Sequence, residues 1–135
     1  MKSLFKITNI LVAITLFASC SNHLKQGDDA YENLAYSKAI EHYEKALAKN
    51  SDPAAATRLA DSYRLTNNHQ QAEKWYAVAI TAPNTTLETR LHYAKALLAN
   101  GKTDLARRQA ARILETSPAN EQARNLLEAC DTRVQ

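Results

Sequence analysis

The segment AEKWYAVAI at residues 72–80 has two relatives elsewhere in the chain. They are AIEHYEKAL at residues 39–47 and ARRQAARIL at residues 106–114. The alanines that open the three segments are 33 and 34 residues apart. A period of this length is typical of repeat arrays, in which one supersecondary unit recurs and buries its apolar face against the next unit.

A second regularity lies upstream of each segment, in another stretch with a helical pattern. A small residue stands 12 positions before each opening alanine, which gives the pairs Gly27/Ala39, Ala60/Ala72 and Ala94/Ala106. Two small side chains that face each other let two antiparallel helices approach closely. The sequence therefore predicts helix hairpins that cross at these pairs.

The composition agrees with a helical protein. The chain has 135 residues, of which 45% are apolar, and only 2 glycines and 3 prolines. This excludes a collagen and argues against an all-β sandwich or a disordered chain. The formal net charge is +3, and it falls to +1 when Lys2 and Lys6 of the predicted leader are removed. So small an excess of positive charge argues against nucleic acid as a partner.

The period and the small pairs resemble the tetratricopeptide repeat, a helix-turn-helix unit of about 34 residues. The resemblance implies an all-α fold, a right-handed α-solenoid of about three helix hairpins. We expect the repeats at residues 20–52, 53–86 and 87–120. Residues 118–132 have a polar outer face and are predicted to form a helix that caps the C-terminal end.

Residues near the expected helix ends support this division. Asp52 before Pro53 predicts an N-cap followed by the first residue of a helix. Thr85 and Glu88 have the spacing of a capping box. Asn100-Gly101 is typical of a turn between helices.

The N-terminus has the pattern of a targeting signal. Residues 1–19 contain two lysines and then an apolar run that is too short for a stable membrane span. Leu16-Phe17-Ala18-Ser19-Cys20 resembles a bacterial lipobox, which implies that Cys20 receives diacylglycerol and acyl chains such as palmitate. The alternative is an ordinary secretion signal with a chance cysteine. By the sorting pattern of such lipoproteins, Ser21 implies a lipid-anchored protein of the cell envelope, in the outer membrane and facing the periplasm.

We find no motif for catalysis. The histidines His23, His42, His69 and His92 are scattered, and none belongs to a zinc-binding motif. We therefore expect no enzyme, no metal site and no cofactor. Cys130 falls at a core position of the last predicted helix, which favours a buried apolar role over a reactive thiol.

The repeat resemblance implies a binding groove lined by the first helix of each unit. The positions that the resemblance assigns to this groove are Asp28, Tyr31, Glu32, Thr57, Asp61, Arg64, Glu88, Leu91 and Lys95. Their mixed charges suit a peptide or protein segment. One subfamily of these repeats binds chaperone carboxyl termini, but Asp28 and Glu88 stand where they would repel a carboxylate, which argues against that specificity.

Two functions follow as hypotheses. The first is a membrane-anchored, non-catalytic scaffold or adaptor that binds a protein or peptide partner in the cell envelope. The second is a structural subunit that self-associates within an envelope or secretion assembly. Residues 31–40 and 59–76 also resemble the repeat region of Bacteroidetes OmpA-family envelope lipoproteins, some of which are linked to envelope assembly and secretion.

Overall fold

The computed structural model describes residues 21–48 and 51–132, and in these residues it contains helices and no strand. The predicted all-α repeat fold is confirmed. The chain divides into two compact units, Met1–Ser51 and Asp52–Gln135, here called unit 1 and unit 2. The predicted leader and the predicted lipid site at Cys20 lie outside the described residues. Within the described ranges, no helix combines the length and the hydropathy needed to cross a membrane.

Unit 1 is a helix hairpin. Residues 21–32 are helical, residues 33–35 form the turn, and α2 runs over Tyr36–Leu47. Gly27 is buried against the ring of Tyr43, which is itself fully buried. A Cβ atom at Gly27 would lie 2.7 Å from two ring carbons of Tyr43. The first helix therefore approaches α2 closely because residue 27 has no side chain.

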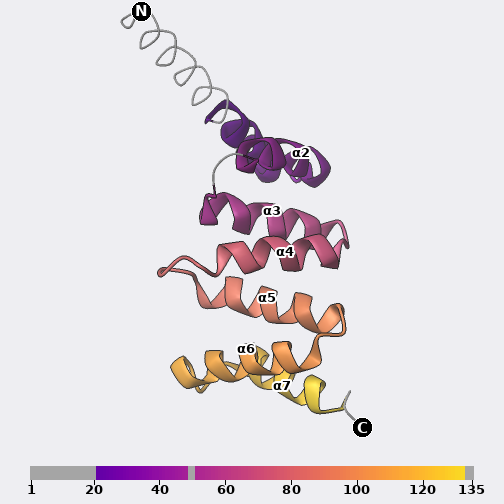
Figure 1. Ribbon diagram of the computed structural model, residues 1–135, viewed down its shortest axis with the longest axis vertical. Coiled ribbons are helices and arrows are strands. Elements are labelled where there is room, and N and C mark those ends of the chain that lie inside the picture. The colour runs from indigo at the N-terminus through magenta and orange to yellow at the C-terminus, as the bar shows by residue number, and fades with distance from the viewer. Residues whose placement is uncertain (1–20, 49–50, 133–135) are drawn as a thin grey trace, which may run out of the picture. The chain divides into compact units, whose positions relative to one another are not determined.

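Unit 2 contains five helices within the described residues, and each packs against the next along the chain (Figure 1). The helix α7 also contacts α5. The bounds are α3 Pro53–Leu65, α4 His69–Ala79, α5 Leu87–Ala99, α6 Thr103–Thr116 and α7 Glu121–Thr132.

The predicted small pairs are buried. Ala60 and Ala72 are fully buried in α3 and α4, and so are Ala94 and Ala106 in α5 and α6. Around Ala94 and Ala106 lies one hydrophobic cluster formed by α5, α6 and α7. Its other members are Leu91, Leu97, Leu98, Ala110, Ile113, Ala123, Leu126 and Cys130. Cys130 is fully buried there, as its helical spacing predicts.

In most of the described helices, a polar side chain caps the N-terminus. The Asp52 carboxylate accepts hydrogen bonds from the backbone N–H groups of Ala54 and Ala55, at 2.9 and 3.3 Å, so the predicted cap is confirmed. The predicted capping box at Thr85 is wrong by one residue. Thr86 caps α5, while the Thr85 hydroxyl donates to the carbonyl oxygens of Ala79 and Ala82. Its hydroxyl is therefore engaged with the preceding loop and does not cap the helix.

The C-terminal helix begins later than residue 118. The Asn120 side chain accepts a hydrogen bond from the backbone N–H of Ala123 at 2.9 Å, and α7 starts at Glu121. The preceding residues belong to the turn after α6. The cap that fixes this start is therefore Asn120.

Adjacent hairpins of unit 2 are also joined by polar contacts at the turn between α5 and α6. The Asn100 side-chain amide donates to the Glu73 carboxylate of α4 at 2.7 Å, and the Lys102 ammonium lies 2.6 Å from the other carboxylate oxygen. Asn100 also donates to the backbone carbonyl of His69 at 3.0 Å. These contacts fix the turn against α4.

The three turns within hairpins share one backbone feature. Leu34, Asn67 and Gly101 occupy equivalent positions, and their φ angles are 59°, 63° and 77°. This left-handed conformation is easy for glycine and tolerated by asparagine, but a bulky residue adopts it at a cost of about 1 kcal/mol or more. Leu34 is therefore the strained member of the set.

Gly27→Ala tests the close approach in unit 1. Because the added methyl group meets the Tyr43 ring, we expect the free energy of unfolding of the hairpin to fall by about 1–3 kcal/mol, as for an overpacked core. Thermal unfolding followed by circular dichroism measures this. Gln26→Ala, one residue earlier at an exposed position, is the control and should unfold as the wild type does.

Candidate functional site

The residues predicted for the groove lie in both units, and those of unit 1 differ in their surroundings. The Tyr43 hydroxyl donates a hydrogen bond to the Asp28 carboxylate at 2.6 Å. Tyr31 packs edge-on against Tyr36, with ring centroids 5.7 Å apart. Glu32 is exposed. Asp28 is therefore held by a core tyrosine, and Glu32 is the most accessible of the three predicted positions.

In unit 2, Asp61 is the centre of a polar network. The Tyr76 hydroxyl donates to the Asp61 carboxylate at 2.5 Å, and the Arg64 guanidinium lies 3.3 Å from the same oxygen. His92 Nδ1 of α5 lies 3.2 Å from it. The Asp61 side chain is only 15% exposed. The repeat resemblance predicts Asp61 as a groove contact, but in the structure its carboxylate is engaged in contacts within and between the hairpins.

The network shifts the pKa values of its members. Burial by itself raises the pKa of Asp61, but hydrogen bonds from His92 and Tyr76 and the charge of Arg64 outweigh burial, so the pKa lies below its ordinary value of 3.8. Burial and the hydrogen bond to Asp61 raise the pKa of the Tyr76 hydroxyl. Asp61 is therefore ionised and Tyr76 is neutral at pH 7.

The same hydrogen bond occurs in both units. Asp28 and Tyr43 are 15 residues apart, as are Asp61 and Tyr76, and in each case a tyrosine of the second helix donates to an aspartate of the first. The third repeat has Lys95 in place of the aspartate. The shared spacing is a signal in the sequence that could have identified these aspartates as packing residues.

The predicted positions of α5 separate into one buried residue and two exposed ones. Leu91 is only 4% exposed and belongs to the hydrophobic cluster with α6 and α7, so little of its side chain is available to a partner. Because α7 packs against α5, the leucine is largely covered. Glu88 is exposed, and Lys95 is exposed and donates to the Gln122 side chain of α7 at 2.8 Å.

A shallow hollow of about 290 Å³ lies between α5 and α7, next to the Asp61 network. The residues around it are Leu87, Glu88, Leu91, His92, Asn120 and Gln122. His92, Asn120 and Gln122 were not predicted as groove residues. Together with Arg64 and Lys95, the residues Glu88, His92 and Gln122 form what we call the α3–α5–α7 face. It presents charges of both signs, from Arg64 of α3 and from Glu88 and Lys95 of α5, beside the neutral Gln122 of α7.

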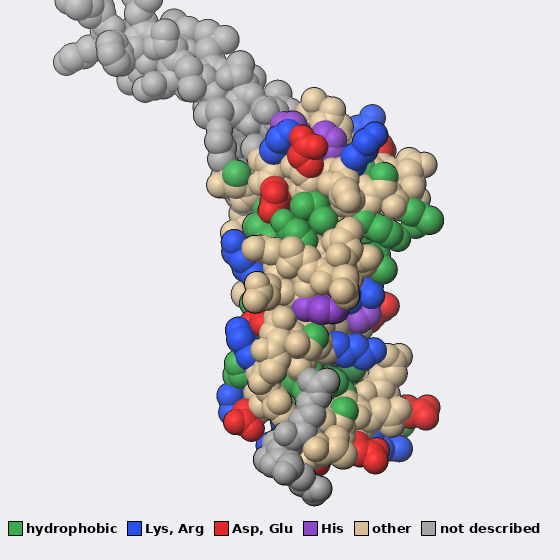
Figure 2. Space-filling view, turned by 90° about the vertical axis from the view of Figure 1, so that its right-hand side faces the viewer, with side chains coloured by type: hydrophobic (Ala, Val, Ile, Leu, Met, Phe, Trp, Pro, Cys, Tyr) green, Lys and Arg blue, Asp and Glu red, His purple; other side chains and the backbone are tan. Residues whose placement is uncertain are grey.

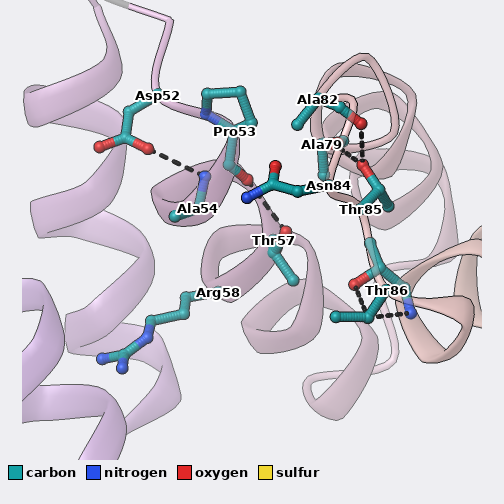
Figure 3. Close-up of a pocket in the computed structure, with 11 residues that line it drawn as sticks. Asp52, Pro53, Ala54, Thr57, Arg58, Ala79, Ala82, Asn84, Thr85 and Thr86 are labelled. Carbon is teal, nitrogen blue, oxygen red and sulfur yellow. Dashed lines mark hydrogen bonds between the residues drawn. The ribbon is translucent and has the colours of Figure 1, made fainter.

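A larger hollow of about 430 Å³ lies at the other end of α3, between α3, the end of α4 and the loop that leads to α5 (Figure 3). Thr57, which was predicted for the groove, lines this hollow, and its hydroxyl donates to the Pro53 carbonyl at 2.9 Å. The Thr85 and Thr86 hydroxyls are likewise bonded to backbone groups. Figure 3 shows the Arg58 guanidinium pointing away from these hydroxyls. The Thr85 and Thr86 hydroxyls thus fix the loop and the start of α5, whereas the Thr57 hydroxyl bonds within α3.

Charged side chains of both signs are spread over the visible surface, with histidines among them (Figure 2). Among residues 21–48 and 51–132, no three His, Cys, Asp or Glu side chains are grouped so that they could hold a metal ion. The α3–α5–α7 face combines the exposed charges of Glu88 and Lys95 on α5 with the partly exposed Arg64 of α3 and the neutral Gln122 of α7. It is the candidate functional site.

A sequence-family comparison agrees with the predicted repeats. The family model described as tetratricopeptide repeat matches residues 24–85, which span the hairpin of unit 1 and the first hairpin of unit 2. Among curated proteins, none matches the sequence.

Solved structures with the same fold are repeat domains. The first tetratricopeptide domain of Spaghetti (RPAP3), bound to an HSP90 peptide, has 22% identity and a TM-score of 0.70 over 87% of this chain and 94% of that chain. The second such domain of human RPAP3, in complex with an HSP70 peptide, has 20% identity and a TM-score of 0.69, over 86% and 98% of the two chains. The Yersinia enterocolitica type III secretion chaperone SycD, in complex with a peptide of the translocator YopD, has 15% identity and a TM-score of 0.66, over 85% and 94%. These likenesses establish the tetratricopeptide-type fold of this chain.

Asp61→Asn tests the polar network. The substitution replaces a carboxylate that accepts several hydrogen bonds, so we expect the free energy of unfolding at pH 7 to fall by about 1–3 kcal/mol. Because the pKa of Asp61 is lowered by folding, its contribution is complete above about pH 4 and is lost as the pH falls through the folded pKa. Chemical denaturation at several pH values should therefore show the gap between wild type and variant narrowing below pH 4. An equal gap at every pH would contradict this role.

Proposed function

We propose that this protein is a non-catalytic, membrane-anchored scaffold of the cell envelope that holds a peptide or protein partner on the α3–α5–α7 face. The proposal rests on the charged side chains of the α3–α5–α7 face, which belong to a fold that is shared with peptide-binding repeat domains. Glu88 and Lys95 are exposed on it, and Lys95 is oriented by Gln122 of the next helix. Charged groups held on rigid helices can select a partner without the cost of ordering a loop.

The mixed charge of the face supports a segment of protein as the partner. Arg64 and Lys95 are basic, Glu88 is acidic, and Asp61 beneath them is bound internally. A surface with both signs selects a partner by the order of charges along it, which an extended peptide can supply. A nucleic acid would require a continuous basic surface.

The anchor is supported by the sequence alone. Cys20 ends a segment that resembles a lipobox, and the described helical residues begin at Ser21. Lipid at Cys20 would hold the repeats at the membrane. A second and third acyl chain make such attachment effectively permanent, because one chain alone binds only marginally.

The experiment is chemical crosslinking in intact cells, followed by pull-down of the protein and mass spectrometry. The test variant is Glu88→Lys/Lys95→Glu, which exchanges the exposed charges of the α3–α5–α7 face without touching Asp61. We expect recovery of the main partner to fall about tenfold, which corresponds to about 1.4 kcal/mol of binding free energy. Arg112→Glu, at an exposed position of α6, is the control and should leave recovery unchanged.

Other outcomes identify where the proposal fails. Unchanged recovery with the charge-exchange variant rejects the α3–α5–α7 face as the binding surface. If the main crosslinked species is a second copy of the protein, the self-associating subunit replaces the scaffold. Cys20→Ser, fractionated in parallel, should move from the membrane pellet to the soluble fraction; a variant that stays in the pellet contradicts the lipid anchor.

A further inference from the structure

The turn of unit 1 exposes a leucine in a position that does not favour it. Leu34 is 69% exposed, the highest value among the exposed large hydrophobic residues of the described chain. Its φ angle is 59°, whereas the equivalent positions in unit 2 hold Asn67 and Gly101, which suit this conformation. Leu34 thus combines an unfavourable backbone conformation with a side chain that gains little from packing. Strain that is retained without a packing benefit is a reason to consider a function at that position.

The turn holds Leu34 in place and presents it outward. The backbone N–H of Leu34 donates to the Tyr31 carbonyl at 3.0 Å, and that of Ala35 donates to the Ala30 carbonyl at 2.8 Å. Tyr31 and Tyr36 flank the turn with their rings edge to face. Tyrosine has an apolar ring and a polar hydroxyl, a combination that is enriched where protein meets the lipid–water interface. The turn therefore carries an exposed aliphatic side chain beside two amphipathic rings.

The hairpin directly follows the predicted lipid site in the sequence, which limits how far its turn can lie from a membrane. Ser21, the first helical residue described, directly follows Cys20. Twelve helical residues span about 18 Å, at about 1.5 Å per residue. If Cys20 carries lipid, no spacer separates the hairpin from the membrane surface. A hairpin that lies along that surface then brings both of its ends, Cys20 and the turn at Leu34, to the bilayer.

We propose that the turn around Leu34 is a second membrane contact, in which the leucine enters the lipid interface and Tyr31 and Tyr36 lie at headgroup level. This proposal rests on the lipid anchor of the proposed function. The exposed side chains of the first helix are all polar or charged, and they are Ser21, Asn22, Lys25, Gln26, Asp29 and Glu32. The hairpin therefore lies on the bilayer without crossing it.

The contact is apolar in character. Residues 21–48 contain five acidic and three basic side chains, so they carry no excess of positive charge that would attract anionic lipid. The contact should accordingly persist in zwitterionic vesicles and at high salt. A contact that depends on anionic lipid contradicts the proposal.

The experiment uses the full-length lipidated protein in phosphatidylcholine vesicles, with and without brominated acyl chains, which quench tryptophan. Leu34→Trp adds a tryptophan at the turn, and the emission of Trp75 in the unsubstituted protein is subtracted. We expect brominated lipid to lower the added emission by about half, as for a side chain about 5–10 Å into the interface. Leu105→Trp, at a 40% exposed position of α6, is the matched control and should not be quenched.

A second variant separates this role from a structural one. Leu34→Asn places at the turn the residue that unit 2 has at position 67, so the midpoint of thermal unfolding should rise or stay the same. A lower midpoint would show that Leu34 is needed for folding and would overturn the proposal.

The lipid anchor is measured in the same preparation, so that the two proposals can fail separately. If mass spectrometry shows lipid on Cys20 and the tryptophan at position 34 is not quenched, the second contact is rejected and the anchor stands. If Cys20 carries no lipid, both are rejected. Crosslinking from position 34 to a protein in intact cells, with none to lipid, would also overturn the membrane contact.

Discussion

The rest of the structure depends on how closely two helices can approach at a pair of small residues. At Ala60/Ala72 and Ala94/Ala106 both side chains are buried, and at Gly27 the Tyr43 ring occupies the place of a Cβ atom. Dispersion contacts between packed helices are weak individually and are lost when a gap opens, so larger side chains at these positions would cost packing energy. Larger residues nearby, such as Leu59, Leu97 and Ile113, can then fill the space around each crossing.

Hydrogen bonds between tyrosine and aspartate side chains add directional contacts to this packing. Tyrosine hydroxyls donate to Asp28 and Asp61, so each of these two hairpins has one partly buried polar pair that links its two helices. Hydrophobic contacts alone are not directional, whereas a buried carboxylate left without donors would cost free energy. In unit 2, His92 and Glu73 extend this ordering from one hairpin to the next. The exposed charges of the candidate site are thus carried by a framework that the buried ones help to fix.

The sequence predicted the fold well because its period and its small residues are local and repeated. It predicted the site less well, because position within a repeat does not specify what covers a side chain. Leu91 has a groove position by that criterion, yet α7 packs beside it and buries it. Asp61 also has a groove position, but its carboxylate contacts Tyr76, Arg64 and His92 from three different helices. The strain at Leu34 could not be foreseen, since a φ angle follows from the turn geometry and the residue type there argues against it.

The proposed activity follows from this division between buried and exposed polar groups. A scaffold needs a surface whose charges keep their positions when a partner arrives, and the α3–α5–α7 face has this property because its helices are fixed by the small-residue crossings. The lipid anchor and the turn at Leu34 would add only location, by placing unit 1 at a membrane.

The most direct test of the close-approach principle is the unfolding free energy of Ala94→Leu compared with that of Ala99→Leu. Ala94 is fully buried where α5 meets α6, whereas Ala99 is exposed near the end of α5. We expect the free energy of unfolding to fall by about 1–3 kcal/mol for the leucine at position 94 and hardly at all for the leucine at position 99. Equal stability of the two variants would show that the hairpins do not depend on small residues at their crossings.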